Sequence, residues 1–207
     1  MPTDIGDARA CDRLAETAVR ELGGIDILVA NAAHDGYGGD LVDGALDDLR
    51  AAMDVNLFGT LQSIRAVAPV MRDAGGGRIV VVNTMLAELV MPGFANYSVS
   101  KAALLHACRH LAVELGAWGI RVNSVLPGAI SGRALQRYYE QLAEHRGTTW
   151  EAVRDEAFGA TALGYVPPSD EVVGTIVYLA SDLARPVTGQ AIRVNAGQWE
   201  SLPDGRV

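Results

Sequence analysis

The chain has 207 residues, of which 49 % are hydrophobic and 20 % charged, and its net charge is −8. This length suits one well-buried domain and is short for two. The negative charge argues against a nucleic-acid surface, which depends on clustered Lys and Arg. Because the sequence contains no apolar run of membrane-spanning length and no signal-peptide pattern at its start, we expect a cytoplasmic protein without nucleic-acid or membrane partners.

The first long element expected is a helix from Asp7 to Leu22, in which apolar or small residues recur at helical spacing. Asp7 is its expected N-cap, and Gly23 its stop. Before it, residues 3–5 could end a strand. After it, Ile25–Ala30 form an apolar run without polar alternation, which is typical of a strand covered on both faces, as in a parallel sheet. A loop rich in Gly and Asp follows as far as Gly39.

The same alternation continues along the chain. The expected helices are Leu46–Met71, Ser98–Gly116 and Ser169–Ser181, the last with Ser169 as N-cap. The expected strands are Arg78–Asn83, Ile120–Val125 and Gln190–Asn195. Residues 129–168 depart from this rhythm and suggest a helical lid over a substrate site, and a short polar tail ends the chain.

Strands that alternate with long helices indicate βαβ units, and therefore an α/β fold with a doubly wound, Rossmann-like parallel sheet. In such sheets ligands bind beyond the carboxyl ends of the strands. Three groups of small or polar residues occupy those ends, namely Asn31-Ala32-Ala33, Asn83-Thr84 and Pro127-Gly128.

Tyr97 and Lys101 lie four residues apart at the start of one helix, so their side chains share a face. A lysine charge about 4 Å from a phenol is worth roughly 4 kcal/mol at an effective dielectric of about 20, or about three pKa units. Such a shift would bring a tyrosine, whose ordinary pKa is ~10, into the range of general acid–base catalysis. The same spacing also occurs in ordinary surface helices, but Lys101 is the only lysine of the chain.

The cysteines and histidines do not suggest a metal site. Cys11 and Cys108 lie on the apolar sides of their helices and are expected to be small core residues. His106 and His110 lie four residues apart on a helix and are expected to form a surface pair.

Taken in order, these motifs resemble the short-chain dehydrogenase/reductase family in its compact form. The matching segments are Asn31-Ala32-Ala33, Asn56 in D-V-N, Tyr97 with Lys101, Arg121-Val122-Asn123, and Pro127-Gly128. The resemblance covers essentially the whole chain. It implies a hydride-transfer enzyme that interconverts a carbonyl and a secondary alcohol, with NAD or NADP as cofactor and a small molecule as substrate.

The resemblance also implies roles for single residues. Tyr97 would be the acid/base, Lys101 would lower the pKa of the phenol and bind the nicotinamide ribose, and Thr84 would orient the carbonyl. Asn56 would hold a water that links Lys101 to solvent, unless it only kinks a long helix. The expected cofactor contacts are Asp4, Ile5, Asn31, Ala32, Ala33, Tyr97, Lys101, Pro127, Gly128 and Ile130.

The chain departs from the family pattern in three places. Thr84 stands where the family has a serine, although a threonine keeps the hydroxyl, and Ala33 stands where the family has a glycine. The family's first strand, glycine-rich turn, helix and second strand have no counterpart before Asp26, so the cofactor's pyrophosphate lacks its helix N-terminus. The sequence is therefore interpreted as an N-terminally truncated domain over residues 1–207, with an open edge at its first strand.

Three functions remain open at this point. Besides the oxidoreductase, the chain could be a non-catalytic member with an oligomerising or regulatory role, or an epimerase or dehydratase of the same family. The aromatic residues of the lid suggest an apolar substrate pocket, or else packing for an oligomer or for the lid itself; they are Tyr138, Tyr139, Trp150, Phe158 and Tyr165. The resemblance implies a homodimer or homotetramer, packed through the helices at Tyr97–Gly116 and Ser169–Ser181.

Overall fold

The computed structural model describes residues 1–34 and 39–198. Parts of the glycine-rich loop and the polar tail expected from the sequence lie outside these residues. The α-helices are α1 (Ala8–Leu22), α2 (Leu46–Met53), α3 (Thr60–Asp73), α4 (Ala95–Gly116), α5 (Arg133–Arg146), α6 (Trp150–Gly159) and α7 (Ser169–Ala180). The strands are β1 (Ile27–Ala30), β2 (Gly77–Val82), β3 (Ile120–Pro127) and β4 (Ala191–Val194). The shorter helical turns are η1 (Asp54–Gly59), η2 (Met85–Ala87) and η3 (Asp182–Ala184).

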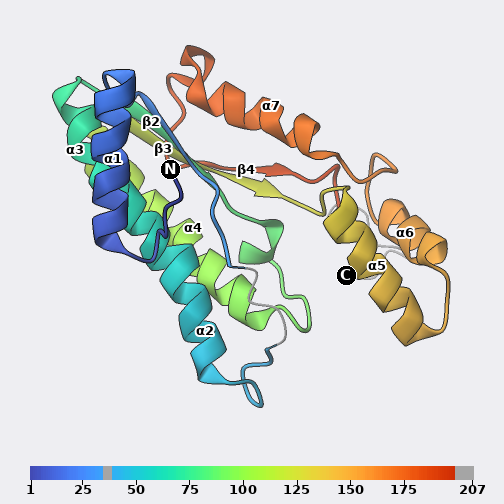
Figure 1. Cartoon of the computed structure of the whole chain (residues 1–207). Coiled ribbons are helices and arrows are strands. Elements are labelled where there is room, and N and C mark those ends of the chain that lie inside the picture. Colours follow the sequence, from blue (N-terminus) through green and yellow to red (C-terminus); the bar gives the residue numbers. More distant parts are fainter. Residues whose placement is uncertain (35–38, 199–207) are drawn as a thin grey trace.

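The strands form one sheet in the order β1-β2-β3-β4, and every pairing is parallel. In register, Val29 pairs with Val80, and Val80 with Asn123. The predicted parallel α/β fold is therefore confirmed. Because all strands run the same way, the segments that follow them emerge at one edge of the sheet, and the lid helices α5 and α6 stand beyond this edge (Figure 1).

Helices cover the two faces of the sheet, α7 on one side and α3 and α4 on the other (Figure 1). Successive side chains of β2 point to opposite faces of the sheet, as in any β-strand. Ile79 and Val81 are fully buried in the core that includes α3 and α4, whereas Val80 is fully buried in the core against α7.

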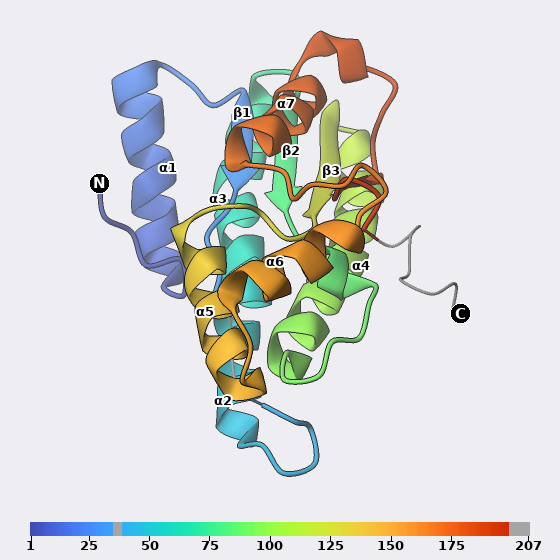
Figure 2. The same cartoon turned by 90° about the vertical axis from the view of Figure 1, so that its right-hand side faces the viewer.

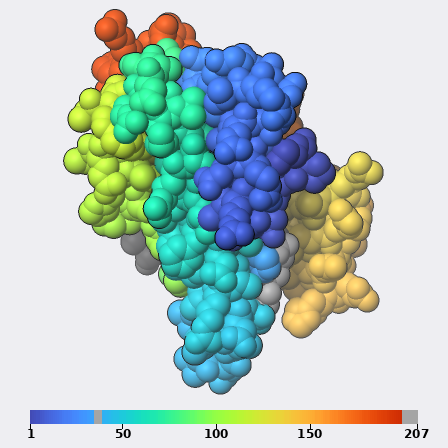
Figure 3. All heavy atoms as spheres, turned by 60° about the vertical axis from the view of Figure 1, so that its left-hand side comes forward, coloured from blue at the N-terminus to red at the C-terminus, as the bar shows by residue number. Residues whose placement is uncertain are grey.

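The first strand differs from its prediction, because it is not covered on both faces. Ile27 and Val29 are 47 % and 43 % exposed. The helix α1 packs mainly against α3, and the two lie side by side on the surface (Figure 3). The outer edge of β1 consequently borders a groove of about 490 Å³, whose lining includes Leu14, Leu22 and Ala32.

Three further expectations about secondary structure are corrected. The helix expected to run without a break from Leu46 to Met71 is interrupted by the π-helical segment η1, which contains Asn56. Ser169 is the first residue of α7, and Pro168 occupies the N-cap without a side-chain hydrogen bond; the acidic first turn favours the helix instead. Residues 3–5 form no strand, because β1 has no strand beside its outer edge in the described chain. The predicted cap of α1 is confirmed, since Asp7 accepts a hydrogen bond from the Arg9 amide.

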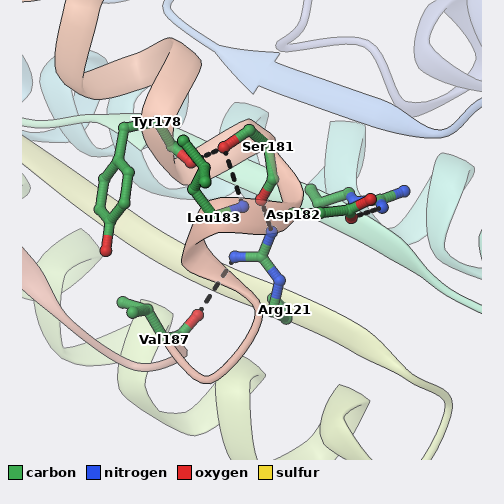
Figure 4. A network of polar contacts seen from close by, with 7 residues as sticks. Arg121, Tyr178, Ser181, Asp182, Leu183 and Val187 are labelled. Atoms are coloured by element: carbon green, nitrogen blue, oxygen red, sulfur yellow. Dashed lines mark hydrogen bonds and ion pairs between the residues drawn. The ribbon is translucent and has the colours of Figure 1, made fainter.

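Arg121 joins the start of β3 to the segment that follows α7 (Figure 4). Its Nη2 donates to the Ser181 carbonyl at 3.0 Å and its Nη1 to the Val187 carbonyl at 3.2 Å. In the same network, Asp182 pairs with Arg78 at the start of β2. These contacts lie at the amino ends of the strands, opposite the edge that carries the polar residues, so we assign them a structural role.

The lid helices α5 and α6 pack mainly against each other; they lie side by side in Figure 2 and stand apart from the sheet in Figure 1. Tyr139, Ala143 and Val153 are the buried residues of their own small core. Of the described helices, none combines the length and apolar character needed to cross a bilayer.

Candidate active site

The first turns of α4 place Tyr97 and Lys101 together beside the end of β2, as their spacing predicts. Lys101 is 2 % exposed, and its Nζ lies 5.8 Å from the centre of the Tyr97 ring. The same Nζ donates a hydrogen bond to the Val82 carbonyl at 3.1 Å. A buried ammonium is thereby fixed beside a half-buried phenol.

Burial lowers the pKa of this lysine but leaves it charged at pH 7. Desolvation lowers the pKa of Lys101 from 10.5 to about 8, and the nearby Cys108 opposes the shift only in part. An ammonium with this pKa still carries its proton at pH 7. A positive charge beside a phenol favours the ionised form of the phenol, which is the property that a tyrosine base requires.

Thr84 follows the end of β2 and is largely buried, with 9 % of its surface exposed. Its Oγ1 accepts a hydrogen bond from the Leu86 amide at 3.3 Å and so caps η2. The preceding residue, Asn83, was not assigned a role from the sequence. Its Oδ1 accepts from the Thr84 amide at 3.0 Å, and its Nδ2 donates to the Lys101 carbonyl at 3.2 Å. Asn83 therefore links Thr84 to α4, and the signal for it was a polar residue directly after an apolar strand.

Asn56 is fully buried in η1 and ties the segment after β1 to α4. Its Oδ1 accepts from the His34 amide at 2.7 Å, and its Nδ2 donates to the His34 carbonyl and to Ser100 Oγ, both at 2.8 Å. Ser100, which the sequence did not single out, donates in turn to the Tyr97 carbonyl at 2.8 Å. π-helical segments are frequent at functional sites, and this one brings an amide to the base of the Tyr97 turn. The water expected at Asn56 remains a prediction.

The residues expected beneath a cofactor lie along the same edge of the sheet. Asn31, Ala32 and Ala33 directly follow β1 and are exposed, so small side chains leave the backbone open to a ligand. Pro127 ends β3. At Gly128, a Cβ atom would lie 2.6 Å from the Gln198 side chain and 2.7 Å from that of Asn195. The close approach of these two turns therefore requires glycine.

The remaining predicted contacts lie on either side of this edge. Ile130 is partly buried against the α7 core. Ile5 lines the groove beside β1, as do Asn31 and Ala32. Asp4 is part of the turn before α1, where its Oδ1 accepts from the Gly6 amide at 2.9 Å. It is not among the residues that line the groove.

The lid aromatics make packing and polar contacts in the structure, and a substrate pocket among them remains a prediction. Tyr139 is buried within the lid, and Trp150 packs there, while Phe158 lies under the Arg154 guanidinium at 5.9 Å. Tyr165 donates to Glu171 at 2.6 Å. Tyr138 forms an edge-to-face contact with Phe94, with ring centres 6.2 Å apart. Since Phe94 immediately precedes α4, this contact joins the lid to the segment that carries Tyr97.

Comparison with known proteins agrees with this geometry. A family model described as enoyl-(acyl carrier protein) reductase matches residues 1–198. A human protein named dehydrogenase/reductase SDR family member 4 is 34 % identical over 193 residues, which cover 93 % of this chain and 66 % of that protein. The chain belongs to the short-chain dehydrogenase/reductase family. It spans about two thirds of the length of this human relative.

Other relatives match this chain to a similar extent in sequence and structure. A protein of Mycobacterium tuberculosis, named as an uncharacterised NAD-dependent oxidoreductase, is 35 % identical over 202 residues, which cover 94 % of this chain and 70 % of that protein. A 7α-hydroxysteroid dehydrogenase, solved in complex with NADH and 7-oxo glycochenodeoxycholic acid, is 30 % identical with a TM-score of 0.84 and covers 97 % of this chain and 74 % of its own. An NAD⁺-bound xylitol dehydrogenase is 25 % identical with a TM-score of 0.85 and covers 93 % and 76 %, respectively. All four of these relatives are named as oxidoreductases or dehydrogenases.

Proposed function

We propose that this chain forms the catalytic part of an NAD(P)-dependent oxidoreductase that interconverts a carbonyl and a secondary alcohol of a small molecule. The observation that carries the proposal is the buried Lys101 ammonium beside Tyr97, at the carboxyl edge of a parallel sheet. Membership of the family supports it. The reaction requires an acid/base that can exchange a proton with the substrate oxygen near neutral pH.

In this mechanism a bound nicotinamide supplies or accepts the hydride. During reduction, the Tyr97 hydroxyl donates its proton to the substrate oxygen, and during oxidation the tyrosinate takes it back. Lys101 stabilises the tyrosinate through its charge. The Thr84 hydroxyl donates a hydrogen bond to the same oxygen. Asn83 holds the Thr84 segment against α4, and Asn56 holds the segment after β1 against α4.

The residues present fit one half of a dinucleotide better than the other. The exposed Ala32 and Ala33, together with Lys101 and the Pro127–Gly128 turn, suit the nicotinamide and its ribose. Among the described residues, no glycine-rich turn lies beside β1 to receive a pyrophosphate. We propose that residues 1–207 belong to one Rossmann-like domain with residues 129–168 as its lid, and that the pyrophosphate and adenine half of the cofactor site lies along the groove beside β1.

The decisive assay is hydride transfer from NADH and NADPH to a panel of ketones, run with the 207-residue chain and with the reading frame extended upstream. The panel includes 7-oxo bile acids and ketoses, because structural relatives are a 7α-hydroxysteroid and a xylitol dehydrogenase. Tyr97→Phe should lose about 10²–10⁴-fold in rate, the usual contribution of a positioned acid/base. Tyr178→Phe, on α7, is the matched control. Full turnover in Tyr97→Phe would refute the mechanism.

The open groove beside β1 favours one alternative, a non-catalytic member of the family that keeps the fold without holding the cofactor. Isothermal titration of the 207-residue chain with NAD and with NADP separates the two. A chain that unfolds cooperatively yet binds neither supports the alternative for this segment. Tight binding of either excludes it.

The proposal also includes the oligomeric state and the cellular location of the protein. We propose a homodimer or homotetramer in the cytoplasm, in which a second copy covers the outer faces of α4 and α7. Val113 on α4 and Val177 on α7 are 81 % and 60 % exposed, and burying them against a second copy would be favourable. Light scattering coupled to gel filtration measures the mass; a monomer at high concentration would contradict this assembly.

A further inference from the structure

Two histidines on the outer side of α4 form a close pair. His106 and His110 are both exposed, and one helical turn separates them. Their ring centres lie 5.0 Å apart with the planes inclined at 72°. The opposite side of the helix is buried, where Cys108 and Leu105 face the interior. In the single chain the pair therefore stands on a rigid scaffold with both rings exposed, on the face of α4 that the proposed second copy would cover.

This separation matches that of two imidazoles bound to one metal ion. A zinc ion about 2.0–2.1 Å from one nitrogen of each ring lies roughly 3.2 Å from each ring centre, so tetrahedral ligation sets the centres about 5.2 Å apart. The observed 5.0 Å is close to this value, so the two side chains need to turn toward a common ion without moving apart. Ordering two side chains normally costs conformational entropy, and the backbone of α4 already spaces these two for chelation.

We propose that His106 and His110 chelate a divalent transition-metal ion of the zinc or nickel class on the outer face of α4. Neutral imidazole suits these ions, whereas Mg²⁺ and Ca²⁺ prefer oxygen ligands. No group of three metal-ligating side chains occurs among the described residues, so water, or the same pair from a second copy across α4, completes the coordination. The nearest charged residues along this part of the helix are Arg109 and Glu114, both exposed.

The site is separate from the catalytic residues, because Lys101 is directed to the buried side of the same helix. Binding can therefore be measured without any turnover, and its failure leaves the proposed oxidoreductase untouched. An ion that binds the folded pair and not the unfolded chain also raises the stability of the fold.

The test is titration calorimetry of the EDTA-treated 207-residue chain with ZnCl₂, NiCl₂ and MgCl₂ at pH 7.5. We expect saturable binding of zinc and nickel, no binding of magnesium, and a rise in melting temperature with zinc. His106→Ala and His110→Ala should each weaken binding by at least about tenfold, since even the loss of a residue that only supports a ligand costs 10–100-fold. The matched control is His145→Ala, at the end of α5, which should bind as the unaltered chain does.

Stoichiometry identifies the remaining ligands. One ion per chain indicates water at the open positions, and one ion per two chains indicates that a second copy supplies its own pair; either supports the chelate. His106→Gln serves as a second variant should the alanine variant fold poorly. Equal affinity in all variants, or no zinc binding up to millimolar concentration, would overturn the proposal.

Discussion

We predict how pH changes the stability of a Lys101→Met variant. The free energy of unfolding of the variant, relative to that of the unaltered chain, should be higher at pH 7 than at pH 9.5. Lys101 is 2 % exposed, and burial lowers its pKa from 10.5 to about 8. Lowering the pKa from 10.5 to about 8 corresponds to about 3 kcal/mol of destabilisation wherever the lysine is charged in both the folded and the unfolded state. Methionine is similarly long and carries no charge, so it removes this cost.

The sign of the pH dependence follows from proton binding. Between pH 8 and pH 10.5 the unfolded chain still holds the lysine proton while the folded chain releases it, so the stability of the unaltered chain rises with pH in this window. The penalty of about 3 kcal/mol at pH 7 falls to about 1 kcal/mol at pH 9.5. The stability difference between Lys101→Met and the unaltered chain should therefore shrink by about 2 kcal/mol over that range.

The absolute difference at pH 7 is smaller than the full penalty, because the variant loses the hydrogen bond from Nζ to the Val82 carbonyl. A hydrogen bond from a charged donor contributes about 1.5–3 kcal/mol, so a net gain of up to about 2 kcal/mol is expected at pH 7. Catalysis should fall at the same time.

Urea unfolding followed by tryptophan fluorescence at pH 7 and pH 9.5 measures both quantities. Arg65→Met, an exposed position on α3, controls for the loss of a positive charge and should show no such drift. A difference that stays constant between the two pH values would mean that the ammonium is not desolvated, and the reasoning would fail.

Three further changes test the packing. Ala196 has a φ of 52°, a left-handed conformation that costs an alanine about 1–2 kcal/mol, so Ala196→Gly should raise stability by about 0.5–1 kcal/mol after the entropy cost of glycine. Arg121→Ala removes two hydrogen bonds to loop carbonyls that each keep one other donor; losing these two bonds from a charged donor should cost about 1–3 kcal/mol, whereas Arg185→Ala, at an exposed site nearby, should be neutral in the same melting experiment. Gly39→Ala would place a Cβ 2.1 Å from the side-chain nitrogen Nδ2 of the buried Asn96 on α4, so it should lower the melting temperature. Gly174→Ala, where nothing lies within 4 Å of the new Cβ, should raise it. A Gly39→Ala variant as stable as Gly174→Ala would contradict the close approach.

Much of the site could be predicted from the sequence because its geometry is local. Tyr97 and Lys101 share a helix turn, and the four-residue spacing alone sets their side chains on one face. The parallel sheet followed from apolar runs that alternate with long helices, and it then brought the strand ends to one edge. The sequence did not predict the hydrogen-bond partner of each polar side chain in the site. The amide of Asn83 bridges Thr84 and α4, and Ser100 joins Asn56 to Tyr97, but hydrogen bonds between residues far apart in sequence leave no periodic signal.

The sequence by itself determined the order of strands and helices and the residues that could carry acid–base chemistry, because these depend on spacing along one element. Only the tertiary structure decided how deeply Lys101 is buried, and hence its lowered pKa and its cost in stability, because desolvation depends on the residues packed around the ammonium. It also decided that β1 is half exposed beside a groove, although its apolar sequence is typical of a covered strand. Burial belongs to the assembled neighbours of a residue, and those are fixed only when the chain has folded.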